Sequence, residues 1–317
     1  MSNSTGNSTT TGGDHQDLFA DFKYYHYNPS MAAAIVFIIL FLATSAVHTW
    51  QLAKRRTWYF IPFLLGGFFE WIGYIGRALS AKETPNWTLG PYIMQTLLLL
   101  VAPALFAASI YMVLGRIIRL TDGERCSLIR SKWLTKIFVA GDVISFLAQS
   151  GGGGMLAQAK TESAVQTGNH IIVGGLVVQV LFFGLFVIVA SVFHVRINRN
   201  PTTRSASIDV PWARFLYVLY AASVFIMIRS IFRVAEYTQG NDGTLLGHEV
   251  YLYVFDACLM FFTMVLFNVW HPSRIIPRGG RGDAEAGVGY MMPGRDVPNP
   301  ISPTPSHMGR QTAMPKS

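Results

Sequence analysis

Seven long apolar segments follow one another between Ala32 and Trp270, and they constrain the fold more than any other feature of the sequence. Each segment has the roughly 20 residues that an α-helix needs to cross about 30 Å of hydrocarbon. The apolar residues form continuous blocks, without the polar stripe that runs along a helix of a soluble protein. The sequence therefore predicts an all-α polytopic membrane protein with a bundle of seven transmembrane helices. The predicted helices cover residues 32–53, 58–79, 91–115, 136–157, 170–194, 212–236 and 250–270.

The two ends of the chain differ in composition from this apolar region. Residues 1–28 are rich in Ser, Thr, Asn and Gly, and residues 275–317 combine prolines and glycines with few large apolar side chains. Segments of this kind bury too little apolar surface to fold alone. We expect a disordered N-terminal segment at 1–28, a transmembrane domain at 29–274 and a disordered C-terminal tail at 275–317.

Basic residues alternate between successive connecting segments, and this pattern predicts the orientation in the membrane. Lys and Arg are concentrated after the first, third and fifth apolar segments, whereas the other connections are nearly free of them. Loops rich in Lys and Arg remain on the cytosolic side. We therefore expect the N-terminus outside and the C-terminus in the cytosol, which places the glycosylation motifs at Asn3, Asn7 and Asn86 on the outer side. The basic loops are residues 54–56, 116–136 and 196–204.

The net charge of +8 is explained by these loops, with attraction to anionic lipid as a secondary effect. We expect no nucleic-acid partner. The chain contains neither the glycine-lysine pattern of a P-loop nor the H-E-x-x-H pattern of a zinc hydrolase. The sequence therefore predicts a protein that is not an enzyme and that uses no cofactor and no metal.

Ionisable residues inside the apolar segments are the strongest pointers to function. The sixth segment places Arg229, Arg233 and Glu236 on one helical face. A charge at the centre of a bilayer costs roughly 2.5–3.5 kcal/mol on insertion scales, so such residues are usually paired inside a bundle and often mark a pathway. The candidate translocation path consists of Glu70, Arg77, Gln95, Asp142, Gln149, Arg229, Arg233, Glu236 and Asp256.

Counting along each helix sorts these residues by depth. We expect Glu70 and Gln179 in the middle, with Asp142 and His48 towards the cytosol, and Glu249 at the outer mouth of the last helix. The remaining residues of the path form a predicted outer cluster: Arg77, Gln95, Gln149, Arg229, Arg233, Glu236 and Asp256.

Two interpretations of these polar residues stay open. They are either structural ion pairs that lock the bundle or groups that contact a substrate. Arg77 and Arg233 favour the structural interpretation, because arginine forks onto carboxylates. Glu70 and Asp142 favour the functional one, since neither has a partner on its own helical turn, and a deep carboxylate can bind an ammonium group or carry a proton.

Helix-breaking residues occur in two of the segments. Pro103 lies within the third segment, where it should free a backbone carbonyl and produce a kink. Residues 151–154 are four consecutive glycines. They predict close packing of helices, fraying of the helix into the following loop, or a flexible gate.

Several of these segments carry specific motifs. They include Glu70-x-x-Gly73-Tyr74-x-x-Arg77 and Asp142-x-x-Ser145-x-x-x-Gln149. The most specific motifs lie in the sixth and seventh segments: Arg229-Ser230-x-Phe232-Arg233-x-x-Glu236-Tyr237 and His248-Glu249-x-x-x-Tyr253-x-Phe255-Asp256. Read together, the motifs resemble the fungal lipid-translocating exporter family of RTA-like proteins, over about residues 25–275.

The resemblance implies a seven-helix protein that moves lipids outward, including sphingoid long-chain bases, and that confers resistance to toxic amphiphiles. Its partners would be membrane lipids and an amphiphilic small-molecule substrate. The resemblance places it in the plasma membrane, with the vacuolar and endoplasmic reticulum membranes as alternatives. With no nucleotide site, the driving force would be a substrate gradient or proton coupling.

The rival hypothesis is a seven-helix receptor or stress sensor that changes lipid asymmetry indirectly, through a cytosolic regulatory partner. The predicted topology permits it. Against a G-protein-coupled receptor of the usual type, Gly115-Arg116-Ile117 replaces the acidic-arginine-aromatic triplet at the end of the third helix.

Overall fold

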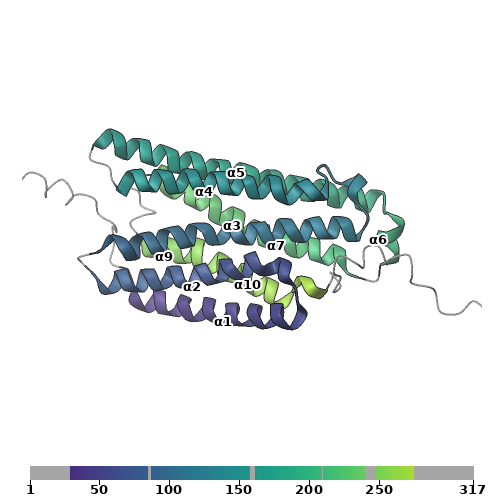
Figure 1. The fold of residues 1–317 in the computed structure, drawn as a ribbon, viewed down its shortest axis with the longest axis horizontal. Coiled ribbons are helices and arrows are strands. Elements are labelled where there is room, and N and C mark those ends of the chain that lie inside the picture. The colour runs from purple at the N-terminus through teal and green to yellow at the C-terminus, as the bar shows by residue number, and fades with distance from the viewer. Residues whose placement is uncertain (1–28, 85–86, 158–160, 209, 240–247, 275–317) are drawn as a thin grey trace, which may run out of the picture. The chain divides into compact units, whose positions relative to one another are not determined.

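The apolar segments of the sequence form long helices in a computed structural model, which describes residues 29–84, 87–157, 161–208, 210–239 and 248–274 (Figure 1). These described residues contain helices and connecting turns but no strand. The long helices are α1 (Met31–Arg55), α2 (Ile61–Lys82), α3 (Leu89–Leu120), α4 (Ser131–Ala157), α5 (Glu162–Arg199) and α7 (Trp212–Thr238). The shorter elements are η2 (Trp58–Phe60), η3 (Glu124–Cys126), α6 (Thr203–Ser207), α9 (Glu249–Leu252), η4 (Tyr253–Cys258), α10 (Leu259–Val269) and η5 (Pro272–Arg274).

Six helical segments of the described chain are long and apolar enough to cross a membrane, which makes this an integral membrane protein. They comprise α1, α3, α5, α7, the continuous run of η2 and α2, and the continuous run from α9 to α10. The prediction of an all-α membrane protein is thereby confirmed. The remaining predicted span, 136–157, lies within α4, which has 27 residues but is less apolar because it includes Asp142, Gln149 and four glycines. The tails expected at 1–28 and 275–317, and the motifs at Asn3, Asn7 and Asn86, lie outside the described residues.

The helices extend further than the apolar segments predicted. α3 continues to Leu120 and α5 covers Glu162–Arg199, whereas the sequence predicted ends at residues 115 and 194. The turns added at their C-terminal ends carry Arg116, Arg119, Arg196 and Arg199, which an apolar window excludes, although long arginine side chains can extend out of a bilayer. Apolarity therefore locates the spans but not the ends of the helices.

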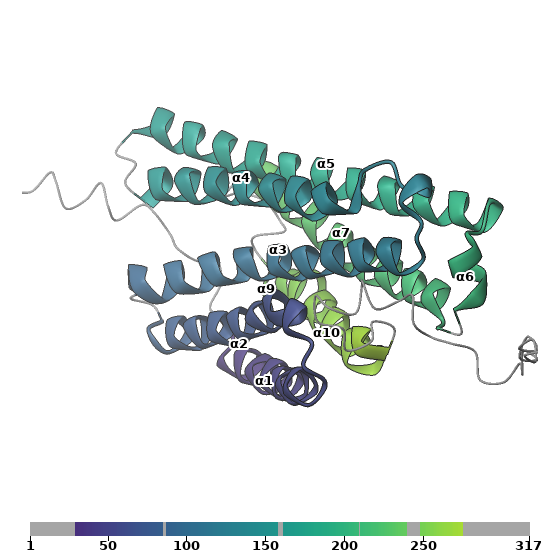
Figure 2. The same cartoon turned by 45° about the vertical axis from the view of Figure 1, so that its right-hand side comes forward.

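Two groups of helices share α3 and α7. In the first group, which we call the first lobe, α1, α2, α3, α7 and the α9–α10 run pack in a closed ring. In the second lobe, α3, α4, α5 and α7 form another ring. Figures 1 and 2 show α4 and α5 on one side of α3 and α7, and α1, α2 and α10 on the other. A displacement of α3 would therefore change helix contacts in both lobes.

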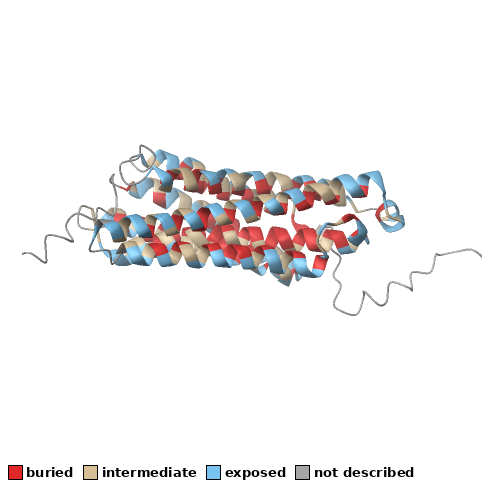
Figure 3. Cartoon of the chain, turned by 90° about the horizontal axis from the view of Figure 1, so that it is seen from above, coloured by how far each residue is buried: buried red, intermediate tan, exposed pale blue. Residues whose placement is uncertain are grey.

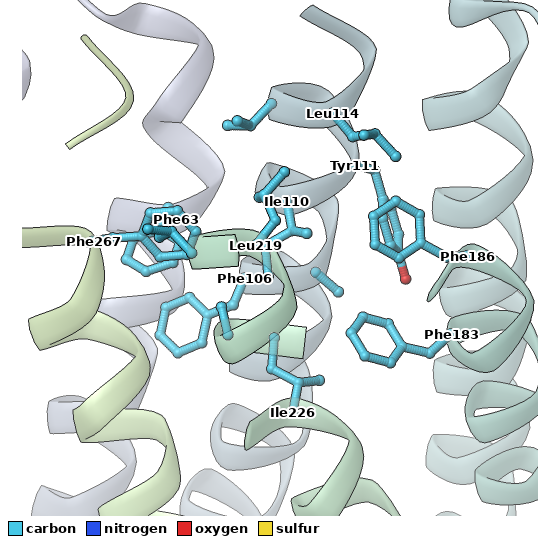
Figure 4. Close-up of a cluster of buried hydrophobic side chains, with 14 of the residues drawn as sticks. Phe63, Phe106, Ile110, Tyr111, Leu114, Phe183, Phe186, Leu219, Ile226 and Phe267 are labelled. Carbon is cyan, nitrogen blue, oxygen red and sulfur yellow. The ribbon is translucent and has the colours of Figure 1, made fainter. Parts of the chain in front are cut away.

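Buried residues lie between the helices, and exposed residues cover their outer faces and ends (Figure 3). The buried side chains include a continuous aromatic and aliphatic cluster that passes from one lobe to the other. Figure 4 shows Phe63, Phe106 and Phe267 on one side of this cluster and Tyr111, Phe183 and Phe186 on the other, with Leu219 and Ile226 between them.

The basic connections meet at one end of the bundle, which we call the basic end. The Thr202 hydroxyl donates to the Thr121 carbonyl at 2.5 Å, which joins the α5–α6 and α3–α4 connections. The Arg116 guanidinium lies 3.9 Å from the ring centre of Tyr59, which joins α3 to the α1–α2 connection. The three loops that the sequence predicted to be cytosolic therefore lie together, and Ser30, Glu83 and Glu249 lie at the opposite end.

Candidate functional site

The first lobe gathers seven of the nine candidate residues, and all seven are buried. They come from four elements that meet in the half of the lobe away from the basic end. Glu70 and Arg77 lie on α2, Gln95 on α3, Arg229, Arg233 and Glu236 on α7, and Asp256 on η4.

Arg77 ties three elements together at the end opposite the basic end. Its guanidinium donates to Glu249 at 2.7 Å and to the Tyr253 hydroxyl at 2.9 Å. The Glu249 carboxylate also accepts the backbone N–H of Ser30, at 2.8 and 3.0 Å to its two oxygens. Because Ser30 caps α1, this network joins the start of α1 to α2 and α9.

Arg229 makes the deepest ion pair of the lobe. Its Nε donates to Asp256 at 2.5 Å, and its Nη2 donates to the Leu99 carbonyl at 2.6 Å. Leu99 lies four residues before Pro103, which has no N–H to complete the helical hydrogen bond. The carbonyl that the sequence predicted to be free is therefore the acceptor of this guanidinium, and α3 continues through the proline.

The third arginine is paired within its own helix. Arg233 donates to Glu236 at 2.7 Å, one turn further along α7. Three arginines thus engage three carboxylates, as charges in a low-dielectric interior require.

Glu70 is the carboxylate that these pairs omit. Its side chain is 1% exposed, and neither of its oxygens accepts a hydrogen bond from any described residue. Its charged neighbours are Asp256, Arg229 and Arg233. Glu70 therefore lies beside the Arg229–Asp256 pair without belonging to it.

The other two candidate residues lie in the second lobe. Gln149 donates to Gln179 of α5 at 3.1 Å, so it belongs to the α4–α5 interface and not to the predicted outer cluster. Asp142 is 5% exposed, and no hydrogen bond of good geometry reaches either of its oxygens, although the Tyr111 hydroxyl of α3 lies beside it. Residues 137–157 of α4 and 162–195 of α5 contain no Lys or Arg to balance its charge.

The glycine run beside Gln149 stays helical. A Cβ atom on Gly152 would lie 2.7 Å from the Gly168 carbonyl oxygen of α5, while Gly151, Gly153 and Gly154 face open space. Close packing, one of the interpretations left open by the sequence, therefore holds for Gly152.

Comparison with known proteins decides the family. Residues 63–279 match the family described as RTA1 like protein. The chain belongs to the RTA1-like family. All nine candidate residues of this RTA1-like protein lie within the matched region.

Named relatives occur in Saccharomyces cerevisiae. Protoporphyrin uptake protein 1 is 38% identical over 78% of this chain and 91% of its own length. Protein RTA1 is 35% identical over 88% of this chain and 94% of its own length. The sphingoid long-chain base transporter RSB1 is 27% identical over 98% of this chain and 85% of its own length. No solved structure matches this RTA1-like protein.

Two features of the RTA1-like site escaped sequence reasoning. The sequence predicts Glu249 at the outer mouth of the last helix but does not pair it with Arg77, and it gives Tyr253 no role beyond its place in the last motif. Both residues lie with Asp256 in the first part of the α9–α10 run. This part contains a π-helical turn at η4, Tyr253–Cys258. Such turns are rare and often occur at functional sites. The spacing of Glu249, Tyr253 and Asp256 at helical intervals was the available signal.

An aromatic layer separates the charged residues of this RTA1-like protein from the basic end. Phe60 and Phe63 stack with ring centres 4.5 Å apart, and Phe63 lies 5.0 Å from Phe267. His48 packs against this layer and shares a 3.0 Å hydrogen bond with the Met264 carbonyl. The first lobe therefore has packed rings towards the basic end and the Arg77–Glu249 network at the other end.

The described residues contain no group of three or more His, Cys, Asp or Glu side chains placed to hold a metal ion. Among the described residues, the first lobe contains a network of paired charges beside Glu70, an acid without a hydrogen-bond partner, and the second lobe contains another such acid, Asp142.

Proposed function

We propose that this RTA1-like protein moves amphiphilic lipids, such as sphingoid long-chain bases, outward across its membrane and thereby protects against toxic amphiphiles. The observation that carries this proposal is Asp142, a buried carboxylate with no Lys or Arg among residues 137–157 of α4 or 162–195 of α5. The name of one relative, a sphingoid long-chain base transporter, supports the substrate class.

Asp142 suits an amine-bearing lipid for a simple electrostatic reason. An ionised carboxylate that leaves water needs a countercharge, and neither α4 nor α5 supplies one at this depth. The ammonium group of a long-chain base would provide that charge. The Tyr111 hydroxyl lies beside the carboxylate and can orient it, and the Gln149–Gln179 pair offers amide groups at the next polar level.

This proposal includes α4 as the seventh transmembrane helix. Val143, Ile144 and Leu147 of α4 are 49%, 60% and 61% exposed, so this helix presents to its surroundings the same bare apolar face as the other spans. Large exposed apolar surfaces of this kind are suited to lipid. Seven spans put the N-terminus and the C-terminus on opposite sides, and the basic end would face the cytosol.

The route would follow the second lobe. A long-chain base from the inner leaflet would place its amine at Asp142, pass the Gln149–Gln179 pair and leave towards the outer leaflet. Its alkyl chain would stay in the bilayer, against the apolar faces of α4 and α5. We place this activity in the plasma membrane, where outward movement of a toxic amphiphile protects the cell.

A second candidate function comes from another relative. Protoporphyrin uptake protein 1 shares 38% of aligned residues with this chain, and its name specifies a different amphiphile and the opposite direction. Protoporphyrin carries carboxylates, which would prefer arginines to Asp142. A dependence of transport on Asp142 would therefore favour export of a long-chain base over uptake of protoporphyrin.

The experiment measures release of a labelled long-chain base from cells that express the chain, alongside uptake of protoporphyrin. We expect Asp142→Asn to reduce release at least tenfold at unchanged surface abundance. Asp122→Asn is the matched control, because Asp122 is exposed at the basic end and its φ of 51° suits asparagine.

Each alternative gives a different result. Normal release from Asp142→Asn would sink the proposed role of this carboxylate. Uptake of protoporphyrin without any release of long-chain base would favour the second candidate. Release that requires another cellular protein would favour the receptor or sensor that acts through a cytosolic partner.

A further inference from the structure

The buried charges of the first lobe do not balance. Away from the basic end, the described helices of this lobe enclose the guanidinium groups of Arg77, Arg229 and Arg233. They also hold the carboxyl groups of Glu70, Glu236 and Asp256, which are buried, and of Glu249, which is 16% exposed. Each arginine has a carboxylate partner at 2.7 Å or less, and Glu70 remains.

The surroundings of Glu70 offer an ionised carboxylate little stabilisation. Asp256 on η4 presents a second negative group whose Oδ2 also accepts no hydrogen bond from a described residue. Arg229 and Arg233 on α7 are the nearby cations, and both are already engaged. The nearby phenol is Tyr74, which lies one turn along α2.

The other helices packed against this part of α2 add no charge. α1 contains no ionisable residue before His48, α10 contains none, and α3 has only tyrosines before Arg116. Burying an ionised carboxylate without hydrogen bonds costs several kcal/mol. A proton on Glu70 removes that cost and makes the charges of the lobe equal.

We propose that Glu70 is a proton-binding site and that its loss and uptake of a proton drive the movement of lipid through the second lobe. This inference rests on the proposed transport function. It assigns the energy source to a proton gradient and gives the two lobes separate tasks, since the proton binds in the first lobe and the lipid amine binds at Asp142.

Arg229 and α3 provide the physical connection between the two sites. While Glu70 is protonated, Arg229 is held by Asp256 and by the Leu99 carbonyl of α3. When Glu70 loses its proton, two carboxylates compete for this guanidinium, and turning it towards Glu70 releases Leu99. The same helix carries Tyr111, which lies beside Asp142 in the second lobe. Deprotonation in one lobe therefore changes the position of a side chain at the lipid site in the other.

The test uses the full-length protein in liposomes, with the membrane potential clamped by potassium and valinomycin. The probe is a labelled long-chain base with a trimethylammonium head, because a permanent charge prevents passive trapping by pH. For an exchange of one proton per lipid, a gradient of one pH unit corresponds to about tenfold accumulation on the acidic side, since 1.4 kcal/mol is a factor of ten. A pH-sensitive dye should record proton movement in the opposite direction.

Variants of Glu70 test whether this residue couples proton movement to lipid movement. We expect the ratio of accumulation with and without the gradient to fall from about ten to about one in Glu70→Gln, whatever rate of downhill movement this variant retains. Glu83→Gln is the matched control, because Glu83 lies just beyond the end of the same helix and accepts its hydrogen bonds from Thr88, outside the charge network of the lobe. Glu70→Asp keeps an acid in a new position, so we expect it to remain coupled with a shifted pH dependence of the rate.

The outcomes are distinguishable from failure of the proposed function. This inference alone would be overturned if lipid movement by the wild type did not depend on the pH gradient, or if it depended on a sodium gradient instead. The same holds if the ratio stays near ten in Glu70→Gln or if the pH profile of Glu70→Asp matches the wild type. An absence of lipid movement by the folded wild-type protein would overturn both this inference and the proposed function.

Discussion

Arg229 donates a hydrogen bond of 2.6 Å to the carbonyl oxygen of Leu99, the backbone acceptor that Pro103 leaves without its helical N–H. No water is available in a bilayer core to satisfy such a carbonyl, so its partner has to come from the protein. The same guanidinium neutralises Asp256. Arg229 thus pairs with a buried carboxylate and also satisfies a backbone carbonyl, and the second contact holds α3, the helix that both lobes share, against α7.

A double-mutant cycle measures this relationship. We expect Arg229→Met to destabilise the protein by about 3–5 kcal/mol, because it leaves Asp256 as an unpaired buried charge. In a Pro103→Ala background, where an alanine N–H reaches Leu99, the same substitution should cost about 1–3 kcal/mol less. Unfolding in detergent gives both values.

Arg233→Met is the control for this cycle, since Arg233 pairs with Glu236 and not with Leu99. Its cost should be the same with proline or alanine at position 103. An equal cost of Arg229→Met in both backgrounds would show that the Leu99 hydrogen bond contributes nothing to stability.

Glu249 should hold the first turn of α1 in place. Its carboxylate accepts the Ser30 N–H and the Arg77 guanidinium, and hydrogen bonds to charged groups contribute about 1.5–3 kcal/mol each. We expect Glu249→Gln to accelerate amide hydrogen exchange about tenfold or more at residues 31–34. Glu83→Gln should leave this exchange unchanged, and unchanged exchange in Glu249→Gln would mean that α1 is held by other contacts.

The glycine run gives two adjacent substitutions with opposite expected effects. Gly152→Ala should destabilise the protein by about 1–3 kcal/mol, because the new methyl group would meet the Gly168 carbonyl, a backbone atom that cannot turn away. Gly153→Ala meets nothing within 4 Å and should stabilise the helix by up to about 1 kcal/mol. Thermal unfolding in the same detergent compares them, and equal effects would contradict the packing described for α4 and α5.

If α4 crosses the membrane, its two ends lie on opposite sides. We expect Lys132→Cys to react with a membrane-impermeant maleimide only from the cytosolic side and Ser163→Cys only from the outside. Both positions are exposed in the structure. The background replaces Cys126 and Cys258 by serine, because both are free thiols. Labelling of both positions from the same side would exclude α4 as a transmembrane helix.

Part of this architecture could be predicted from the sequence because hydrophobicity in a membrane protein is a property of single segments. The spans at 32–53 and 212–236 correspond to α1 and α7, each differing by two residues or fewer at either end. Even in these two spans, apolarity marks only the part of the helix that is suited to hydrocarbon. The arginine-bearing last turns of α3 and α5 were missed, since nothing in their composition separates a polar helix end from a loop.

The partners of the polar residues depended on helix packing and could not be predicted by counting depth. Gln149 was placed with Arg229 by depth, but it bonds Gln179 because α4 packs on α5 in the other lobe. The freed carbonyl before Pro103 was predictable, whereas its partner Arg229, 130 residues further along the chain, was not. The π-helical turn at η4 leaves no recognisable pattern in the sequence.

Lipid movement by the purified protein alone would show whether this chain itself moves long-chain bases across a bilayer. The purified chain would be reconstituted in liposomes, and transbilayer movement of a labelled long-chain base would be timed against protein-free liposomes. We predict movement at least tenfold faster with the wild type and with Asp122→Asn, and movement at the protein-free rate with Asp142→Asn. If folded wild-type protein leaves the rate of transbilayer movement at the protein-free value, the proposed lipid transport is wrong.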